Sequence, residues 1–269
     1  MKTFTHIALA LASLLALSCV KEAQPEHNEE PVTVQYGVTV DTPTKALGDG
    51  ETANYVWYAL YRADGSLAKV HNPAKIDADR KAICPVTMVK DQDYKVVFLA
   101  MYYEDETPAY IVDPEAKTVS MPISAQANSD KLDLFYGVDE VKGFQGAQNT
   151  NVTLNRIVAQ VNFELSEEAW NTLGVDSSFK SQIAISGAPA VMYLWDGTLS
   201  GTASMTYAMS TIPAEGRKIG TAYCFASKNG EQKVDAFISL FNASGIEVKA
   251  VSASAVPVAA NKRTNLTIN

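Results

Sequence analysis

The stretch VTVQYGVTV, residues 32–40, decides the fold class because apolar and small polar side chains alternate along its whole length. One face collects the larger side chains, Val32, Val34, Tyr36, Val38 and Val40, and the other face collects Thr33, Gln35, Gly37 and Thr39. A two-residue period is that of a half-buried β-strand. The next residues, DTPTKALGDGE, contain one proline and two glycines and predict a loop.

Short strands and turns continue along the rest of the chain. The clearest strand patterns are YVWYALY (55–61), YKVVFLAMYY (94–103) and IVAQVNFEL (157–165). One short helix is expected at 167–173, with Ser166 as its N-cap and Gly174 as its stop. Many short strands with almost no helix predict an all-β chain of β-sandwiches.

The number of strands is too large for one small sandwich, so the sequence favours two tandem sandwich domains. We expect these at residues 32–174 and 175–269, and residues 32–45 form the first strand and its loop. The segment 19–31 contains VKEAQPEHNEEP, which is polar, acidic and without periodicity. That composition predicts a flexible tether in front of the first domain.

Residues 1–19, MKTFTHIALALASLLALSC, have the layout of a bacterial lipoprotein signal. Lys2 gives a positive start, and the apolar run 7–17 is too short to span a bilayer as a helix. The layout predicts removal of residues 1–18 and attachment of acyl chains, palmitate among them, to Cys19. We therefore expect an outer-membrane lipoprotein at the cell surface or in a fimbrium. The alternative is an ordinary secretory signal with an incidental cysteine.

Composition and motifs argue against several function classes. The formal net charge of −8 disfavours nucleic acid as the main partner. There is no Cys/His ligand spacing for a metal and no GxSxG, HExxH or glycine-rich phosphate loop, so we expect no enzyme, no metal and no cofactor. Cys84 and Cys224 are expected either to form a disulfide or to be two buried free thiols. Arg156 either pairs with a carboxylate or carbonyl group at the domain junction or is an exposed edge arginine.

Five segments are informative when taken together: NYVWYALYRADG (54–65), YKVVFLAMY (94–102), LFYG (134–137), VTLNRIVAQVNF (152–163) and VPVAANKRTNLTIN (256–269). In this order they resemble fimbrillin-like proteins of Bacteroidales. The resemblance covers nearly the whole mature chain. It implies a type V pilus subunit, exported as a lipoprotein and built from two transthyretin-like sandwich domains.

The resemblance also implies assembly by strand exchange. In polymerising subunits a trypsin-like protease cuts after a basic residue behind the first strand, and a strand from a neighbouring subunit fills the groove. Here residues 32–40 would be the removable strand and Lys45-Ala46 the scissile bond. The alternative is that Lys45 is an ordinary loop lysine and residues 32–40 form an integral strand.

The same resemblance leaves the position within a pilus open. Residues from Val248 onward either supply donor strands or complete the second sandwich. In the second case the subunit accepts a strand and donates none, which suits a terminal or anchoring component. Its partners would be other pilin-like subunits, with the membrane held through lipid on Cys19.

A second function fits the sequence as well, that of a stand-alone surface lipoprotein that binds a glycan or a host protein. Trp195 is its candidate contact, because the sequence Trp195-Asp196-Gly197 predicts a turn that would present an indole ring for stacking.

Overall fold

The computed structural model describes residues 30–41, 52–122, 125–146, 150–213 and 216–269. The described residues from Pro31 to Asn269 belong to one compact unit. Within the described ranges, no helix is both long enough and apolar enough to cross a membrane.

Strands make up almost all of the regular structure. In chain order the elements are β1 (Val32–Val40), β2 (Tyr55–Arg62), β3 (Leu67–Val70), β4 (Ala74–Lys75), β5 (Lys81–Met88), β6 (Tyr94–Met101), β7 (Tyr103–Glu104), β8 (Thr107–Pro108), β9 (Ile111–Asp113), β10 (Thr118–Ser120), the 3₁₀ turn η1 (Asp130–Leu132), β11 (Phe135–Val141), β12 (Thr150–Arg156), β13 (Val158–Leu165), α1 (Glu167–Leu173), β14 (Lys180–Ala188), β15 (Val191–Tyr193), β16 (Leu199–Ser200), β17 (Ala203–Thr206), β18 (Ser210–Thr211), β19 (Lys218–Phe225), β20 (Gln232–Phe241), β21 (Glu247–Val258) and β22 (Arg263–Ile268). The predicted all-β fold is confirmed.

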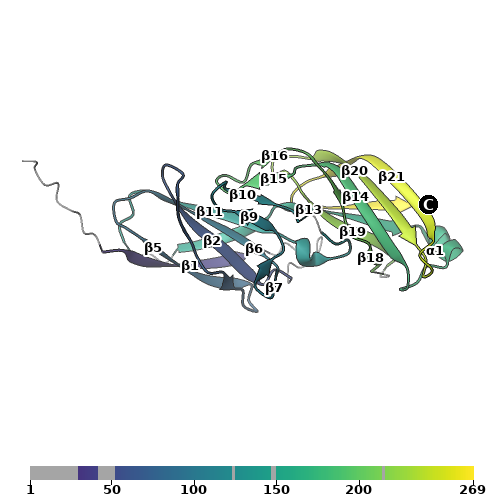
Figure 1. Ribbon diagram of the computed structural model, residues 1–269, viewed down its shortest axis with the longest axis horizontal. Helices are drawn as coiled ribbons and strands as arrows, with labels where there is room; N and C mark the ends of the chain where they lie inside the picture. Colours follow the sequence, from purple (N-terminus) through teal and green to yellow (C-terminus); the bar gives the residue numbers. More distant parts are fainter. Residues whose placement is uncertain (1–29, 42–51, 123–124, 147–149, 214–215) are drawn as a thin grey trace, which may run out of the picture. The chain divides into compact units, whose positions relative to one another are not determined.

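The first half of the chain forms an eight-stranded sheet in the order β3-β2-β6-β11-β12-β1-β5, with β4 also paired to β2 (Figure 1). Strand β5 at one end of this order contacts both β2 and β4 at the other end. The sheet therefore curls onto itself, as strongly twisted sheets do. It encloses an apolar core to which Val38, Cys84 and Phe98 contribute.

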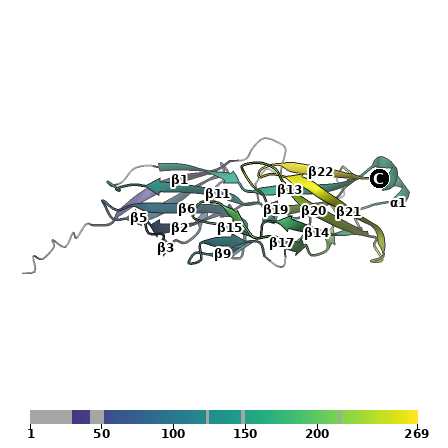
Figure 2. The ribbon, with the colours of Figure 1, turned by 90° about the horizontal axis from the view of Figure 1, so that it is seen from above.

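The second half packs two sheets face to face, in the orders β19-β13-β22 and β17-β14-β20-β21, with β18 paired to β14 (Figure 2). Gly220 on β19 shows how close they come. A Cβ atom there would lie 2.6 Å from the Cδ1 atom of Ile238 and 2.8 Å from that of Ile183. The two isoleucines belong to the opposite sheet, so the glycine lets this sandwich close.

A four-stranded sheet joins segments from both halves of the chain, in the order β16-β15-β10-β9. Its inward residues Val119 and Met192 are fully buried. They belong to one apolar cluster that continues from the outer face of β2, β6 and β11 into the second sandwich. The division into two transthyretin-like domains near Gly174 stays a prediction; the structure pairs β13, which precedes that position, with β19 and β22.

The α-helix α1 follows the sequence signals that predict it. The Ser166 side chain accepts a hydrogen bond from the Ala169 backbone N–H, and Gly174 ends the helix with φ +60°. Both capping predictions are confirmed, and the bounds of α1 are the expected ones.

Candidate functional site

Strand β1 lies inside the eight-stranded sheet, between β12 and β5. It pairs parallel with β12 over residues 36–40 and antiparallel with β5 over residues 32–39. The predicted strand is confirmed with its bounds unchanged. We call the space between β5 and β12 that this strand occupies the β1 slot.

The larger side chains of β1 point into the core, as their alternation predicts. The exposed fractions are 2% for Val34, 1% for Tyr36, 0% for Val38 and 2% for Val40. The Tyr36 ring centroid lies 5.3 Å from that of Phe98 on β6. Full burial of an apolar side chain of this size contributes about 1.5–3 kcal/mol. The β1 slot is thus an apolar groove flanked on both sides by strand edges.

One polar contact ties the inner face of β1 to β11. The Tyr36 hydroxyl donates to Oδ2 of Asp139 at 2.9 Å. Burial, with the nearby Asp139 carboxylate as a second cause, raises the pKa of Tyr36 well above its ordinary value. The phenol therefore stays a hydrogen-bond donor across the physiological pH range.

The outer edge of β5 is protected against further strand pairing. The Tyr58 hydroxyl on β2 donates to the Pro85 carbonyl at 3.4 Å, so this carbonyl faces away from β1. Because the N and O atoms of one strand residue point to the same side, the Pro85 nitrogen also faces that free edge. It carries no N–H, and proline at such a position discourages the addition of another strand.

Arg80 fixes the chain at both ends of the segment that follows β1. Its carbonyl accepts from the Val40 N–H at 2.9 Å, and its guanidinium Nη1 donates to the Ala53 carbonyl at 2.9 Å. Residues 42–51, which hold the predicted cleavage site Lys45-Ala46, lie outside the described residues. Cys19 and its predicted lipid lie outside them as well.

The two cysteines of the described chain are free and buried, so of the two expectations the free thiols hold. Cys84 lies on β5, directly opposite Tyr36 of β1. Cys224 lies on β19 in the second sandwich, opposite Ala159. Burial raises the pKa of each thiol to about 12. Both are therefore unreactive while they stay covered, because the thiolate is the nucleophile.

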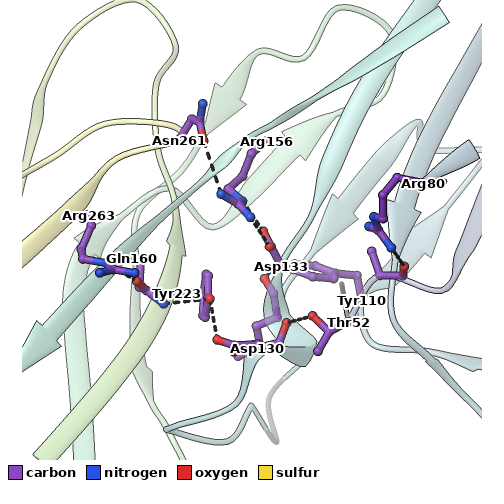
Figure 3. A network of polar contacts seen from close by, with 12 residues as sticks. Thr52, Arg80, Tyr110, Asp130, Asp133, Arg156, Gln160, Tyr223, Asn261 and Arg263 are labelled. Carbon is purple, nitrogen blue, oxygen red and sulfur yellow. Dashed lines mark hydrogen bonds and ion pairs between the residues drawn. The ribbon is translucent and has the colours of Figure 1, made fainter. Parts of the chain in front are cut away.

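Arg156, at the end of β12, forms a buried ion pair where the two halves of the chain meet (Figure 3). Its Nε and Nη2 atoms donate to the two carboxylate oxygens of Asp133 at 2.7 and 2.6 Å. A further bond of 3.4 Å runs from Nη1 to Oδ1 of Asn261. The expected pairing with a carboxylate is confirmed, and the alternative of an exposed edge arginine is wrong.

A second hydrogen-bonded chain runs beside this pair in Figure 3. Arg263 Nε donates to Oε1 of Gln160 at 2.9 Å, and the Gln160 amide donates to the Tyr223 hydroxyl at 2.8 Å. Tyr223 donates to Oδ1 of Asp130 at 2.7 Å, and the Asp130 carbonyl accepts from the Thr52 hydroxyl at 2.8 Å. We call these residues, with Arg156, Asp133 and Asn261, the junction network. It connects β22 to the segment that follows β1.

The strands from Val248 onward complete the second sandwich. Strand β21 pairs antiparallel with β20, and β22 pairs parallel with β13. A side-chain hydrogen bond of 2.9 Å, donated by Nδ2 of Asn162 to Oδ1 of Asn265, holds β22 in register. In this structure the segment is part of its own sheets rather than an unpaired donor.

Trp195 lies at the predicted turn and is half-buried rather than fully presented. The Nζ atom of Lys95 lies 4.1 Å from the centroid of its ring and donates to its carbonyl at 2.9 Å. The indole and the Tyr61 ring meet in a T-shaped arrangement at a centroid distance of 6.1 Å. These contacts join β15 to the first sheet, and the role of Trp195 as a ligand contact stays a prediction.

Three residues that shape the site have no place among the sequence predictions: Arg80, Pro85 and Asp133. For Pro85 a signal exists, because Ala82, Cys84, Val86 and Met88 alternate around it as in an edge strand. Within the described ranges, no group of three or more His, Cys, Asp or Glu side chains is arranged to hold a metal ion.

One sequence family matches residues 25–269; its description reads "Family of unknown function (DUF6562)". No curated protein matches the chain. Among solved structures it is similar to a candidate adhesin from Bacteroides ovatus (16% identity, 82% of this chain and 76% of that one, TM-score 0.53). It is also similar to a fimbrial assembly protein from Parabacteroides distasonis (13% identity, 89% and 92%, TM-score 0.50). A candidate cell-adhesion protein from Bacteroides uniformis matches at 12% identity, 91% and 94%, and a TM-score of 0.51. At these identities the likeness is one of fold.

Proposed function

The chain belongs to a family of unknown function, DUF6562, and on the ground of its own structure we propose that it is a fimbria-related surface subunit that exchanges β1 for a strand of another subunit. The observation that carries the proposal is the position of β1 between two strands of one sheet. Departure of β1 would leave an apolar groove with a strand edge on each side, which is the arrangement that accepts an extended donor segment.

The similar solved structures support the same class of function. Their descriptions name an adhesin, a fimbrial assembly protein and a cell-adhesion protein. For this chain we propose the corresponding place at the cell surface, held to the outer membrane by lipid on Cys19. The scissile bond would be Lys45-Ala46, behind β1.

The pairing of β21 and β22 within their own sheets favours a subunit that accepts a strand over one that donates its C-terminal segment. We therefore propose an anchoring or terminal role within the assembly. The register of β22 depends on polar pairs such as Asn162 with Asn265. If β22 were donated to the apolar β1 slot of another subunit, that slot would offer no partner for such amides.

Thiol labelling provides a direct test, since the chain carries one buried thiol beside β1 and one remote from it. In a Cys19→Ser protein treated with a trypsin-like protease, cleavage at Lys45-Ala46 and loss of β1 should expose Cys84 to an alkylating reagent. Cys224 should stay protected and serves as the internal control for global unfolding. Mass spectrometry would assign each labelled cysteine, and gel filtration would report association.

Two results would contradict the proposal. The first is cleavage after Lys45 with Cys84 still protected and no binding of an added strand peptide, since a bound peptide would itself cover Cys84. The second is joint labelling of Cys84 and Cys224, because the protein would then unfold as a whole instead of opening one slot. A Lys45→Gln variant, which trypsin-like proteases do not cut at this position, controls for cleavage elsewhere.

A further inference from the structure

A pocket of about 570 Å³ lies where three turns of the described chain meet. It is lined by residues 63–65, which follow β2, by residues 116–117 between β9 and β10, and by the end of β15 with the turn after it. We call it the three-turn pocket. Strand β1 contributes nothing to its described lining, so the pocket is separate from the strand exchange proposed above.

Hydrogen bonds between the turns hold this pocket in shape. The Nζ atom of Lys117 donates to the Gly65 carbonyl at 2.7 Å, and the Leu194 N–H donates to the Lys117 carbonyl at 2.8 Å. The Tyr61 hydroxyl donates to the Pro114 carbonyl at 3.0 Å. The turns are therefore tied to one another before any ligand arrives, which lowers the entropic cost of binding.

Two aromatic side chains give the three-turn pocket its apolar surface. Trp195 is half-buried and is held in place by its contacts with Lys95 and Tyr61. Tyr193 is 41% exposed, because it follows the buried Met192 and successive side chains of a strand point to opposite faces. A fixed ring beside an exposed one is a surface on which the C–H groups of a sugar ring can stack.

Polar groups of the same turns can form hydrogen bonds with a ligand. Oδ1 of Asp64 accepts from the Ser66 N–H at 2.8 Å, and Oδ1 of Asp196 accepts from the Thr198 N–H at 2.9 Å. Hydrogen bonding by Ser66 and Thr198 lowers the pKa of these two carboxyl groups below the usual range. Both are therefore ionised at neutral pH, and their Oδ2 atoms can accept from hydroxyl groups.

The charges of the lining bear on the class of ligand. Asp64 and Asp196 supply two carboxylates, and Lys117 is the ammonium group that lines the pocket with them. The nearby Lys95 is paired with Glu140 at 2.8 Å. The lining therefore carries an excess of negative charge, which disfavours a phosphate or an acidic sugar.

We propose that the three-turn pocket binds an uncharged sugar unit, a function beyond the strand exchange proposed above and independent of it. One face of the sugar ring lies against Tyr193 and the exposed part of Trp195. Neighbouring hydroxyl groups of the sugar donate to the carboxylates of Asp64 and Asp196, and Lys117 donates to a sugar oxygen. The volume of the pocket is in the range of small-molecule sites.

Saturation-transfer NMR of the Cys19→Ser mature protein tests the class of ligand. The neutral probes are glucose, galactose, mannose, N-acetylglucosamine, lactose and maltose, and the acidic probes are glucuronic acid and N-acetylneuraminic acid. At least one neutral sugar should receive saturation from the protein, and a titration then gives its Kd. The inference is overturned if no neutral sugar binds or if an acidic sugar binds more tightly than every neutral one.

An aromatic pair of variants tests the place of binding. Tyr193→Ala should weaken binding of the tightest neutral sugar roughly tenfold, whereas Tyr193→Phe, which keeps the ring, should retain it. Phe237 on β20 is the matched control, because its ring is 38% exposed and lies outside the pocket. Phe237→Ala should leave the Kd unchanged.

A pair of aspartates tests the hydrogen bonds in the same way. Asp196→Asn keeps an acceptor for Thr198 but removes the charge, so binding should weaken about fivefold. Asp176 makes the same kind of turn elsewhere, where its Oδ1 accepts from the Ser178 N–H at 2.8 Å. Asp176→Asn should therefore leave the Kd unchanged.

The outcomes bear on this pocket alone. If Tyr193→Ala binds the sugar as tightly as the parent protein, or if Asp176→Asn weakens binding as much as Asp196→Asn, the assignment to the three-turn pocket is overturned. Protection of Cys224 from alkylation verifies that each variant is folded. Strand exchange stands or falls separately, since the labelling of Cys84 reports on β1.

Discussion

Strands β1 and β22 occupy comparable places near the two ends of the described chain, yet they are held by different chemistry. Each lies parallel to a strand of the middle segment, β1 along β12 and β22 along β13. The inner face of β1 is apolar apart from the Tyr36 hydroxyl. Strand β22 is fixed by polar pairs, Arg263 with Gln160 and Asn265 with Asn162.

The difference bears on which strand can be exchanged. Apolar contacts are non-directional, so another alternating strand of similar size can replace β1 with most of the stabilisation retained. Hydrogen-bonded amides demand a matching partner at each position, and an unmatched one leaves a buried polar group without a bond. The comparison predicts a replaceable strand at one end and a register-specific strand at the other.

The largest expected effect comes from the junction network near β22. Arg156→Ala should lower the free energy of unfolding by about 3–5 kcal/mol, because it leaves the buried Asp133 carboxylate without its partner. Urea denaturation measures the loss, with the exposed Arg62→Ala as the control. A loss below about 1 kcal/mol would mean that the pair does not stabilise the junction.

A smaller loss is expected from the apolar face of β1. Val38→Ala should cost about 2.5 kcal/mol, the sum of the lost transfer free energy and the cavity left behind. The isosteric Val38→Thr should cost as much or more, since it places a hydroxyl in the apolar slot. If Thr were tolerated and Ala were not, packing shape rather than apolar burial would hold β1.

Removing one partner of a polar pair that holds β22 should lower the free energy of unfolding. Asn162→Ala should cost about 1–3 kcal/mol, because the Thr221 hydroxyl loses a buried hydrogen bond and the exposed Asn265 side chain loses its partner. The double variant with Asn265→Ala should cost less than the sum of the two single losses. Simple additivity would show that these amides do not act as a pair.

The smallest expected effect is on the pH dependence of stability, through His71 in the first sheet. Burial, with the charge of Lys69 as a lesser cause, lowers the pKa of His71, whose ring stacks on Tyr58 at 4.7 Å. The unfolded chain then binds this proton more readily, so stability is fully present above about pH 6.5 and falls as the pH drops below it. His71→Gln should flatten the dependence of the unfolding free energy on pH between pH 7.5 and 5.5. An unchanged slope would assign the loss of stability at low pH to other groups.

Local patterns in the sequence predict local structure well in this chain. The alternation of residues 32–40 gives the bounds of β1, and Ser166 and Gly174 give those of the helix. Periodicity reports which side of a strand is buried, and capping side chains act within one turn of a helix. These features need no information from the rest of the fold.

The neighbours of β1 could not be predicted in the same way. Strands β5 and β12 are distant in sequence, and pairing over such distances leaves no local period. The alternation around Pro85 is a weak signal, because a proline normally argues against a central strand. For Arg156 the sequence allows both a buried and an exposed position, and only the fold brings Asp133 within reach.

The two bonds of Arg80 bear on the order in which cleavage of the chain and departure of β1 would occur. Its carbonyl holds Val40 and its guanidinium holds Ala53, on either side of residues 42–51. A break of the chain between these two points leaves both fragments attached to the same residue. Under the strand exchange that we propose, peptide-bond scission and strand departure would then be separate steps, and a nicked subunit would persist as a latent form until a partner strand arrives.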